Sequence, residues 1–268
     1  MPSIIETIQA IVRQELAAVR VAELGLVEEI YPHRGASDDD NYGVDVRLKN
    51  SGLLLKRVPV ATGHVGTAAI PNVGDLVLLA FDQGDVNQPI VIGRLYDDED
   101  RAPVNDADEV IFRLPLAAAD DESILGSIKN HGSASPPREL LLEMPPDITL
   151  RITDGTVRAV AGKTEMKLDQ PGTSGGTVTV LAGRTKMVMN QDGDLTVEAA
   201  GAMKLKAARD LTLEGMNVKI KGQLKIDLEA GTQGSFKASL GATVDGGLAA
   251  TVRGATVAVK GITSFSPG

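Results

Sequence analysis

The sequence contains no cysteine and no tryptophan, and aromatic residues make up 3% of its 268 residues. Without cysteine, the chain has no disulfide, no cysteine-ligated metal centre and no thiol nucleophile. Bulky aromatic side chains fill wide hydrophobic cores, so a chain with so few of them is expected to have a thin interior. Glycine, by contrast, occurs 29 times. The composition therefore argues against a conventional globular core.

Long apolar runs are also missing. No stretch approaches the roughly 18 to 20 consecutive apolar residues that a membrane-spanning helix needs. The first 20 residues carry Glu6, Arg13 and Glu15 within their apolar pattern, which is atypical of a signal peptide. The sequence therefore predicts neither a transmembrane helix nor a signal peptide.

Positive charge is scarce in the first half of the chain. Residues 1–144 carry 12 Lys and Arg against 24 Asp and Glu, whereas residues 145–268 carry 15 against 12, which together give the net charge of −9. Tracking a phosphate backbone requires clustered Lys and Arg. We therefore expect no nucleic-acid partner and interpret the acidic half as a solvated surface.

Catalytic and metal-binding motifs are absent from the sequence. The three histidines, His33, His64 and His131, lie in unrelated contexts, and no pair of them has the spacing of a metal site. The acidic runs 38–40 and 97–100 lack the spaced oxygen ligands of an EF-hand loop. We therefore expect no enzymatic activity, no catalytic residue, no cofactor and no bound metal ion.

An amphipathic helix is predicted over residues 3–22, within an N-terminal segment that comprises residues 1–23. Ser3 and Glu6 form a capping-box pattern at its start. Its apolar residues recur at spacings of three and four, at Ile4, Ile8, Ile11, Val12, Leu16 and Val19. The stripe packs either on its own domain or on a partner or symmetry-related copies, and the pattern fits both.

Short β-strands separated by turn residues are predicted in residues 24–103. The candidates are Leu24–Tyr31, Tyr42–Lys49, Leu53–Ala61, Asp75–Phe81 and Pro89–Tyr96. Five strands in about 75 residues are typical of a small Greek-key barrel of the OB type. Residues 104–146 are predicted to connect this barrel to the rest of the chain. Within them, Val110–Leu116 and Arg138–Met144 could be strands on either side of a flexible polar loop.

From residue 147 to residue 268 the sequence repeats a short pattern of alternating apolar and polar residues, with glycine or another turn roughly every 6 to 10 residues. Strict alternation gives each strand one apolar and one polar face. We therefore predict a narrow β-stalk. Its predicted interior residues are Leu195, Val197, Leu205, Leu211, Leu213, Val218, Ile220, Leu224, Ile226 and Leu228.

The polar positions of the stalk carry charges whose sign changes along the chain. They are Glu198, then Lys204 and Lys206, then Glu214, then Lys219 and Lys221, then Asp227 and Glu229. Neighbouring strands would set opposite charges across from each other, which favours one register. The interior residues become smaller after Leu228, so the stalk is expected to taper.

A single sheet of this kind exposes a continuous apolar face to water. Because no helix or second sheet follows to cover it, we expect copies of the same chain to bury it at a shared axis, as an intertwined β-prism. The alternative is a monomeric right-handed β-helix. Such helices use longer coils around a wider core, which the frequent turns and scarce aromatics disfavour.

Two predicted barrel strands and their connection resemble a known family. Residues 70–96 are similar to the OB-fold of the VgrG and phage gpV spike proteins. That pattern has Pro, two residues, Gly-Asp, an apolar strand ending in Phe, a second Gly-Asp, Pro, another apolar strand, and Gly before Leu-Tyr. The matching residues, which we interpret as structural, are Pro71, Gly74, Asp75, Phe81, Gly84, Asp85, Pro89, Gly93 and Tyr96.

The resemblance implies an all-β protein with an N-terminal helix, an OB-fold barrel and a C-terminal intertwined trimeric β-helix. It further implies a structural spike at the tip of a contractile injection system, either a phage tail-like particle or a type VI-like machine, that punctures a target-cell envelope. Such a spike is assembled in the cytoplasm and is extruded or released on contraction. The large barrel domains that precede the OB-fold in VgrG are absent, so a shorter gpV-like spike fits better.

The implied partners are two further copies of the chain, a hub or baseplate protein on the N-terminal side, a PAAR-type tip protein at the C-terminal end, and effector cargo. No histidine follows His131, so an apical metal site of closely spaced histidines is not expected. The tip protein is expected to contact Val259, Gly261, Ile262 and Phe265. The alternative function is an OB-fold module that binds nucleic acid or carbohydrate and carries a β-helical stalk.

Overall fold

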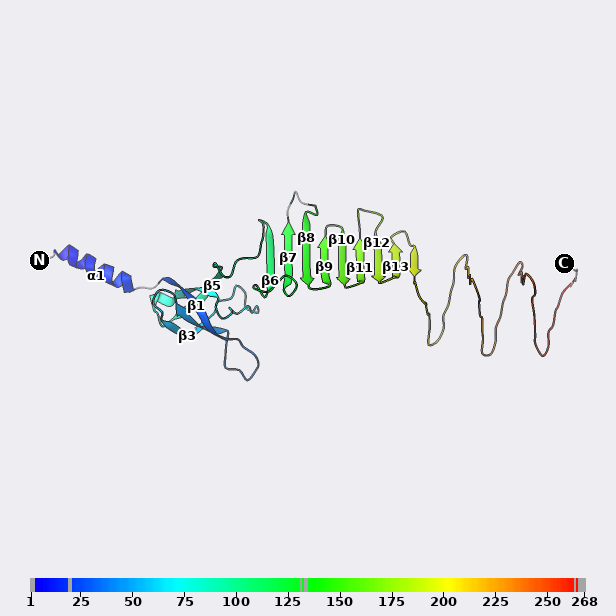
Figure 1. Cartoon of the computed structure of the whole chain (residues 1–268), viewed down its shortest axis with the longest axis horizontal. Helices are drawn as coiled ribbons and strands as arrows, with labels where there is room; N and C mark the ends of the chain where they lie inside the picture. The colour runs from blue at the N-terminus through cyan, green and yellow to red at the C-terminus, as the bar shows by residue number, and fades with distance from the viewer. Residues whose placement is uncertain (1–2, 19–20, 131, 133–134, 263, 265–268) are drawn as a thin grey trace. The chain divides into compact units, whose positions relative to one another are not determined.

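The computed structural model describes residues 3–18, 21–130, 132, 135–262 and 264 (Figure 1). The chain divides into two compact units, residues 1–204 and residues 205–268. The first unit holds one helix, a five-stranded sheet and a nine-stranded sheet, and the described residues of the second unit form neither helix nor strand. The predicted all-β fold class with a single N-terminal helix is confirmed.

Helix α1 spans Ile4–Ala18. Its start forms the predicted capping box, because the Glu6 N–H donates to Ser3 Oγ at 3.2 Å and the Ser3 N–H donates to Glu6 Oε2 at 2.8 Å. Both bonds satisfy backbone donors that lack a partner within the helix. The predicted end of the helix at residue 22 is wrong, since Ala22 already begins strand β1. No described helix is long and apolar enough to cross a membrane.

Strands β1 to β5 form a barrel. Their bounds are Ala22–Tyr31, Gly43–Leu48, Leu54–Pro59, Leu76–Phe81 and Pro89–Leu95, with the short 3-10 turn η1 at Asp82–Gly84. The strands are hydrogen-bonded in the order β3-β2-β1-β4-β5. A parallel bridge between Val60 and Val91, and a 2.8 Å bond from the Ala61 N–H to the Val91 carbonyl, join the end of β3 to β5. This closure gives the five-stranded OB-type barrel that the sequence predicts.

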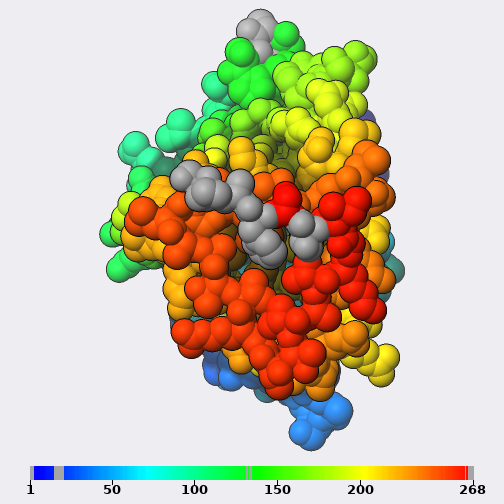
Figure 2. Space-filling view, turned by 90° about the vertical axis from the view of Figure 1, so that its right-hand side faces the viewer, coloured from blue at the N-terminus to red at the C-terminus, as the bar shows by residue number. Residues whose placement is uncertain are grey.

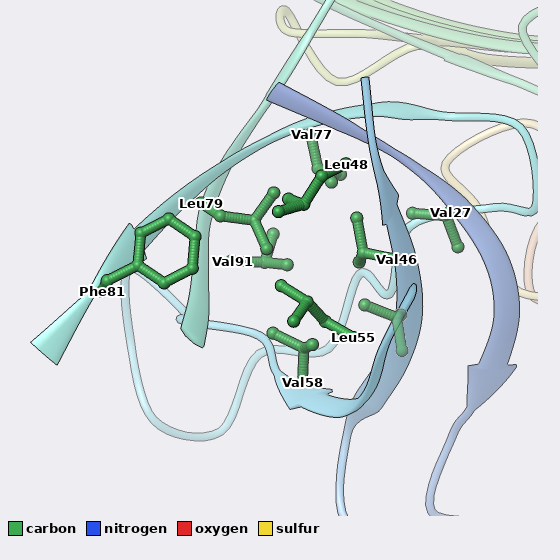
Figure 3. Packing of buried hydrophobic residues seen from close by; sticks show 10 residues of the cluster. Val27, Val46, Leu48, Leu55, Val58, Val77, Leu79, Phe81 and Val91 are labelled. Carbon is green, nitrogen blue, oxygen red and sulfur yellow. The ribbon is translucent and has the colours of Figure 1, made fainter. Parts of the chain in front are cut away.

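The barrel interior is filled by valine and leucine with a single phenylalanine (Figure 3). Its buried residues are Val27, Val44, Val46, Leu48, Leu55, Val58, Val77, Leu79, Phe81 and Val91. They come from all five strands, so every strand contributes one apolar side to the same core. The small side chains give the thin interior expected from the scarcity of aromatic residues.

The nine strands of the second sheet, β6 to β14, are antiparallel and follow one another in sequence order. They span Glu109–Leu114, Ile124–Asn130, Arg138–Met144, Ile148–Thr153, Thr156–Ala161, Thr164–Asp169, Thr177–Ala182, Thr185–Asn190 and Leu195–Glu198. Gly162 and Gly183 have positive φ in two of the hairpin turns, a conformation that glycine adopts without strain. The result is a long meander built from local connections (Figure 1).

This sheet differs from the sequence-based prediction in two ways. Residues 104–146, predicted as a connecting segment, contribute three strands to the sheet. Strands β6 and β8 lie at the two candidate strands of this segment, whereas β7 lies within the predicted flexible loop. Strands β9 to β14, predicted as part of an intertwined stalk, are hydrogen-bonded to neighbours of their own chain. The meander therefore begins near residue 109 and ends at Glu198.

The second unit consists of extended stretches separated by bends, drawn in Figure 1 as a winding trace without arrows. Among its described residues, a single backbone–backbone hydrogen bond occurs, from the Ala249 N–H to the Gly246 carbonyl at 3.3 Å. The alternation of apolar and polar residues continues through it, but the strand pairing within the chain does not.

Candidate assembly surface

One face of the nine-stranded sheet is apolar over its whole length. Residues directly opposite each other on adjacent strands share a face, so the register defines rows that cross the sheet. One row is Val110, Ile128, Leu140, Ile152, Val157, Leu168, Val178, Met189 and Leu195. The next is Phe112, Gly126, Leu142, Leu150, Ala159, Met166, Val180, Met187 and Val197. Neither row contains a polar side chain, and we call this surface the apolar face.

The side chains of the apolar face are exposed or half-buried on the single chain. Phe112 is 57% exposed, Met166 48% and Leu195 61%. Nine strands about 4.8 Å apart, each about six residues long, give this face an area on the order of 800 Å². That exceeds the largest apolar patch of a typical monomer and equals the area that each partner buries in a standard stable interface. A surface of this size and composition is a candidate assembly surface.

The opposite face of the sheet carries charges that pair across strands. Lys129 lies directly opposite both Glu109 and Glu139 on the two neighbouring strands. Its Nζ lies 2.8 Å from Glu109 Oε1. The hydrogen bond with Glu109 raises the pKa of Lys129, against the opposing effect of partial burial. This face is therefore suited to contact with water, and we call it the charged face.

A second ion pair on the charged face is bidentate. Arg158 donates from Nε and Nη2 to the two carboxylate oxygens of Glu165, at 3.0 and 2.9 Å. This pair holds the pKa of Glu165 below its usual value, mainly through the hydrogen bond from Arg158. Planar, two-point pairing of this kind fixes the relative position of strands β10 and β11.

A hollow of about 470 Å³ lies at one end of strands β9 to β13. Its apolar lining consists of Val157, Leu168 and Val178, with Met189, all members of the apolar face. At its rim, Gln191 Oε1 accepts a hydrogen bond from the Gly176 N–H at 3.0 Å. The hollow is thus a deepening of the apolar face.

The predicted interior residues of the stalk are all exposed on the single chain. Leu195 and Val197 lie in β14, on the apolar face. The others lie in the second unit, where exposure ranges from 50% for Ile226 to 101% for Leu224. Figure 2 views the molecule from this C-terminal side, where the orange and red segments of the second unit stand at the surface. Exposed apolar side chains in such number are typical of a surface that contacts another chain.

The predicted contacts for a tip protein lie at the end of the second unit. Val259 is 70% exposed, Ile262 is fully exposed, and Gly261 has a φ of +119°. Phe265 lies outside the described residues. These positions offer a small apolar surface.

Helix α1 also presents uncovered apolar side chains. Ile4, Ile5, Ile8, Ile11 and Val12 are between 49% and 80% exposed. Val19, which the sequence placed on the same stripe, lies outside the described residues. The exposed stripe is a second candidate docking surface.

The first part of the barrel motif forms the turn into β4. Pro71 is fully buried, and Gly74 has a φ of +97°, a conformation that favours glycine. Asp75 Oδ2 accepts a hydrogen bond from the Asn72 N–H at 2.9 Å and lies 3.5 Å from Arg94 Nη1. These contacts fix the entry of the chain into the strand.

The second part of the motif forms the connection between β4 and β5. Phe81 is buried at the end of β4, and Gly84 has a φ of +78°. Asp85 Oδ1 accepts a hydrogen bond from the Asn87 N–H at 2.9 Å, and this bond lowers the pKa of Asp85. Pro89 begins β5, Gly93 lies within it, and the 60%-exposed side chain of Tyr96 follows it. The connection is built from local hydrogen bonds.

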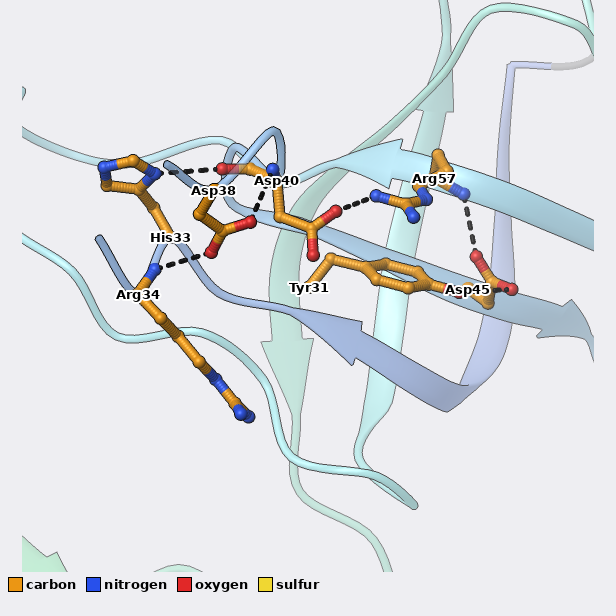
Figure 4. A network of polar contacts seen from close by, with 7 residues as sticks. All are labelled: Tyr31, His33, Arg34, Asp38, Asp40, Asp45 and Arg57. Carbon is orange, nitrogen blue, oxygen red and sulfur yellow. Dashed lines mark hydrogen bonds and ion pairs between the residues drawn. The ribbon is translucent and has the colours of Figure 1, made fainter. Parts of the chain in front are cut away.

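A polar network ties the loop between β1 and β2 to the barrel wall (Figure 4). Arg57, at a φ of 53°, stacks its guanidinium 3.8 Å above the ring of Tyr31 and pairs with Asp40. His33 Nδ1 lies 3.1 Å from the Asp40 carbonyl oxygen. Asp45 is 4% exposed, and its carboxylate accepts a hydrogen bond from the hydroxyl of Tyr31. The network was missed from the sequence, although an aspartate in the apolar strand GVDVRL signals a buried, hydrogen-bonded charge.

The three histidines do not form a site. His33 and His64 lie in separate loops of the barrel, and His131 lies outside the described residues. Within the described part of the chain, no three potential metal-ligating side chains lie together.

The apolar face over β6 to β8 was also missed from the sequence. The spacing of Val110, Phe112 and Leu114, and of Leu140, Leu142 and Met144, is the two-residue period of a half-buried strand. That period could have extended the predicted sheet toward the barrel. The polar stretch between the two runs concealed it.

The comparison with known families agrees with this architecture. Residues 49–96 match the model of the type VI secretion system/phage-baseplate injector OB domain. The matched segment contains β3 to β5 and the whole of the motif at residues 70–96. No curated protein sequence matches the chain. The match supports a structural role in a baseplate or injector assembly.

Proposed function

We propose that the chain is the central spike protein of a contractile injection system, of the short gpV-like kind, and that three copies form one spike. The observation that carries the proposal is the apolar face of nine strands, which follows an injector-type OB domain in the sequence and whose side chains are exposed or half-buried in the described part of the chain. The number three is taken from the resemblance to gpV-like spikes.

The apolar faces of three copies pack against one another around a common axis. Their side chains are Val, Leu, Ile, Met and Ala with a single Phe, which fit a narrow interior. The charged faces then point outward, where cross-strand ion pairs remain in water. Such a prism has few free strand edges, which suits an object driven lengthwise through an envelope.

The other parts of the chain take the remaining contacts of a spike. The exposed apolar stripe of α1, in residues 1–23, docks on a hub or baseplate protein. The barrel of residues 24–103 lies at the base, followed by residues 104–146 and the needle of residues 147–268. The apolar end at Val259, Gly261 and Ile262, continued by Phe265, receives a PAAR-type tip protein, and effector cargo travels with this tip. Assembly takes place in the cytoplasm, and contraction extrudes the spike.

Sedimentation equilibrium of the purified full chain tests the proposal. The expected mass is about three times the 28.0 kDa of one chain, independent of loading concentration in the micromolar range. A monodisperse species of one chain mass would overturn the proposal.

A further inference from the structure

The turns between strands β8 to β14 lie along the two long sides of the nine-stranded sheet. Because the strands are antiparallel and follow one another in sequence order, successive turns alternate between these two sides. We call the two sides margin A and margin B. Margin A carries the turns at 154–155, 170–176 and 191–194, and margin B carries those at 145–147, 162–163 and 183–184.

The two margins carry opposite charge from β10 to β14. On margin A, Asp154 stands in the first turn, and Asp192 and Asp194 stand in the last one. On margin B, two turns share the pattern Ala-Gly-cation-Thr, with Lys163 in one and Arg184 in the other. One side of the sheet therefore ends in carboxylates and the other in cations.

Most of these turn charges lack a partner within the chain. On the neighbouring strands, Arg158 is paired with Glu165. Among the described residues, no ion pair involves Lys163, Arg184 or Asp192. Arg184 and Asp192 lie at opposite ends of the six-residue strand β13, about 20 Å apart. They cannot pair with each other in one copy, so their opposite charges are available to another chain.

The two margins also differ in shape. The turns of margin B at 162–163 and 183–184 contain two residues each, so they are compact. Margin A is recessed, because the hollow of about 470 Å³ lies between its turns and is lined there by Asp154, Gln170 and Gln191. A compact cationic turn fits such a recess with a carboxylate at its rim.

The charges decide which margins of two copies can meet. Margin A against margin A would set carboxylates against carboxylates, and margin B against margin B would set cations against cations, both of which are unfavourable. Margin A against margin B brings opposite charges together. Contact between two different surfaces of the same chain generates a ring when the rotation closes. The charges therefore favour cyclic closure over a two-fold dimer.

The turns of the two margins also match in height along the sheet. Adjacent strands lie about 4.8 Å apart, and turns on opposite margins alternate by one strand. The turn of Lys163 is thus displaced by about 4.8 Å from that of Asp154, and the turn of Arg184 by the same amount from that of Asp192. Rotation about an axis perpendicular to the strands leaves these heights unchanged. Each cation then comes within side-chain reach of one carboxylate of the next copy.

The remaining turn of margin B carries an acid, and its counterpart on margin A is a base. Asp147 lies in the turn between β8 and β9, and Arg138 begins β8 at margin A. The side chain of Arg138 is 71% exposed and pairs with Asp154 of its own chain. Margin B therefore carries acid, base and base along the sheet, whereas margin A carries base, acid and acid at matching heights.

We propose that margin B of each copy docks against margin A of the next copy, with Lys163 beside Asp154 and Arg184 beside Asp192. The inference rests on the proposed function, in which three copies share one axis, and it names the residues that meet at the corners between the three sheets. The apolar faces supply most of the attraction. Exposed ion pairs contribute little to stability, but they exclude the alignments in which like margins meet.

Chemical cross-linking tests the arrangement directly, since the natural sequence has no cysteine. The variant Arg184→Cys/Asp192→Cys carries one thiol on each margin. Within one chain these thiols lie about 20 Å apart, beyond the reach of a short bifunctional maleimide. In the proposed trimer, each thiol on margin B lies beside a thiol on margin A of the next copy. Treatment of the full-length variant is therefore expected to yield a covalent trimer on a denaturing gel.

The matched control is Lys163→Cys/Arg184→Cys, which places both thiols on margin B, about 9.6 Å apart in one chain. This variant is expected to migrate as a single chain. A covalent dimer from the control, or from the single variant Asp192→Cys, would show that like margins meet and would overturn the inference. A species that sediments as a trimer but forms no cross-link in the 184/192 variant also rejects the docking of the margins, while leaving the proposed spike intact. Sedimentation of the natural chain as a monomer rejects both.

Exchanging the charges of Arg184 and Asp192 provides an independent test. Arg184→Asp or Asp192→Arg alone sets like charges at every corner and is expected to lower the thermal midpoint of the trimer by a few degrees. The exchange variant Arg184→Asp/Asp192→Arg restores opposite charges and is expected to recover most of that loss. Because about 20 Å within one chain exceeds the Debye length of about 8 Å at physiological salt, such recovery arises between copies.

Lys56→Asp in the barrel is the control for the change in net charge. Lys56 is exposed on β3, and its substitution is expected to leave the midpoint nearly unchanged. If the losses caused by the two single substitutions simply add in the exchange variant, residues 184 and 192 do not meet and the inference is wrong.

Discussion

The buried carboxylate of Asp45 accepts a hydrogen bond from the backbone N–H of Arg57 at 2.8 Å, across the neighbouring strands β2 and β3. The hydroxyl of Tyr31 donates to the other oxygen of the same carboxylate at 3.2 Å. One side chain thus satisfies donors from two strands at a point where the register of β2 and β3 shifts between Val44 and Val46.

Replacing this carboxylate is predicted to destabilise the barrel. Asp45→Ala leaves the Arg57 N–H and the Tyr31 hydroxyl without their acceptor, at a cost of about 1–3 kcal/mol. Thermal unfolding of the full chain followed by circular dichroism measures the effect. The exposed loop residue Asp39 serves as control, and Asp39→Ala is expected to leave the midpoint unchanged. An equal effect of both substitutions would contradict the assigned role of Asp45.

Tyr31 is predicted to ionise at a higher pH in the folded barrel than in the unfolded chain. A hydrogen bond to Glu29, then burial, then Asp45, raise the pKa of Tyr31 to about 12. Because an unfolded tyrosine ionises near pH 10, this contribution to stability is present below pH 10 and is lost between pH 10 and 12. Ultraviolet absorbance of tyrosinate should show a titration step near pH 12. Tyr31→Phe should remove that step.

The same substitution at two adjacent residues of strand β12 is predicted to have opposite effects on trimer formation. Val180 lies on the apolar face, whereas Thr179 lies on the charged face opposite Lys167. Val180→Asp buries a charge at the shared axis and is expected to abolish the trimer, since an unpaired buried charge costs several kcal/mol. Thr179→Asp is expected to preserve it. Sedimentation velocity of the two proteins compares them, and a trimeric Val180→Asp protein would remove the apolar face from the interface.

Substitutions in the second unit test in the same way whether its apolar side chains face the interior of the trimer. Leu213→Asp or Ile226→Asp places three charges near one axis without partners, so dissociation to monomers is expected. Lys219→Ser, at an outward position, should change the sedimentation coefficient and thermal midpoint little. If Leu213→Asp and Lys219→Ser behave alike, residue 213 does not face the interior.

Acid is predicted to weaken the charged face of the sheet at the contact of Arg158 with Glu165. The pKa of Glu165 is lowered in the folded state, so the stability it contributes is present above its ordinary pKa, near 4.3, and is lost as the pH falls through the lowered value. Arg158→Met removes the cause of the shift. The thermal midpoint of this variant, measured from pH 6 to pH 3, should fall less steeply than that of the natural chain. The prediction would be contradicted if the thermal midpoints of the two proteins fell equally steeply with decreasing pH.

The barrel could be predicted from the sequence because its strands are short, alternate regularly and end at turn residues. All five predicted strands are found, each within two residues of its expected bounds. Strand β7 could not be predicted, because Gly126 and Ser127 interrupt its apolar pattern. The reason for Gly126 is a tertiary contact, since a Cβ at this position would lie 2.8 Å from Cδ2 of Phe112 on the neighbouring strand.

The predicted stalk shows that one sequence pattern can occur both in a strand paired within the chain and in a segment without such pairing. Residues 195–198 and 211–214 have nearly the same pattern, LTVE and LTLE. The first forms a strand paired with β13 of its own chain, whereas the second makes no backbone pairing within the described part of the chain. Alternation of apolar and polar residues predicts which side chains share a face of a strand. It does not predict whether the neighbouring strand comes from the same chain or from another copy, because that depends on how the copies are arranged.

The local connections of the meander also bear on the order in which a spike comes together. Each strand from β7 to β14 pairs with the strand before it, so the sheet has low contact order and can form as the chain leaves the ribosome. The apolar face then exists before its partners arrive. Encounter between nascent chains therefore competes with aggregation, and synthesis of neighbouring copies on one messenger RNA would favour productive assembly.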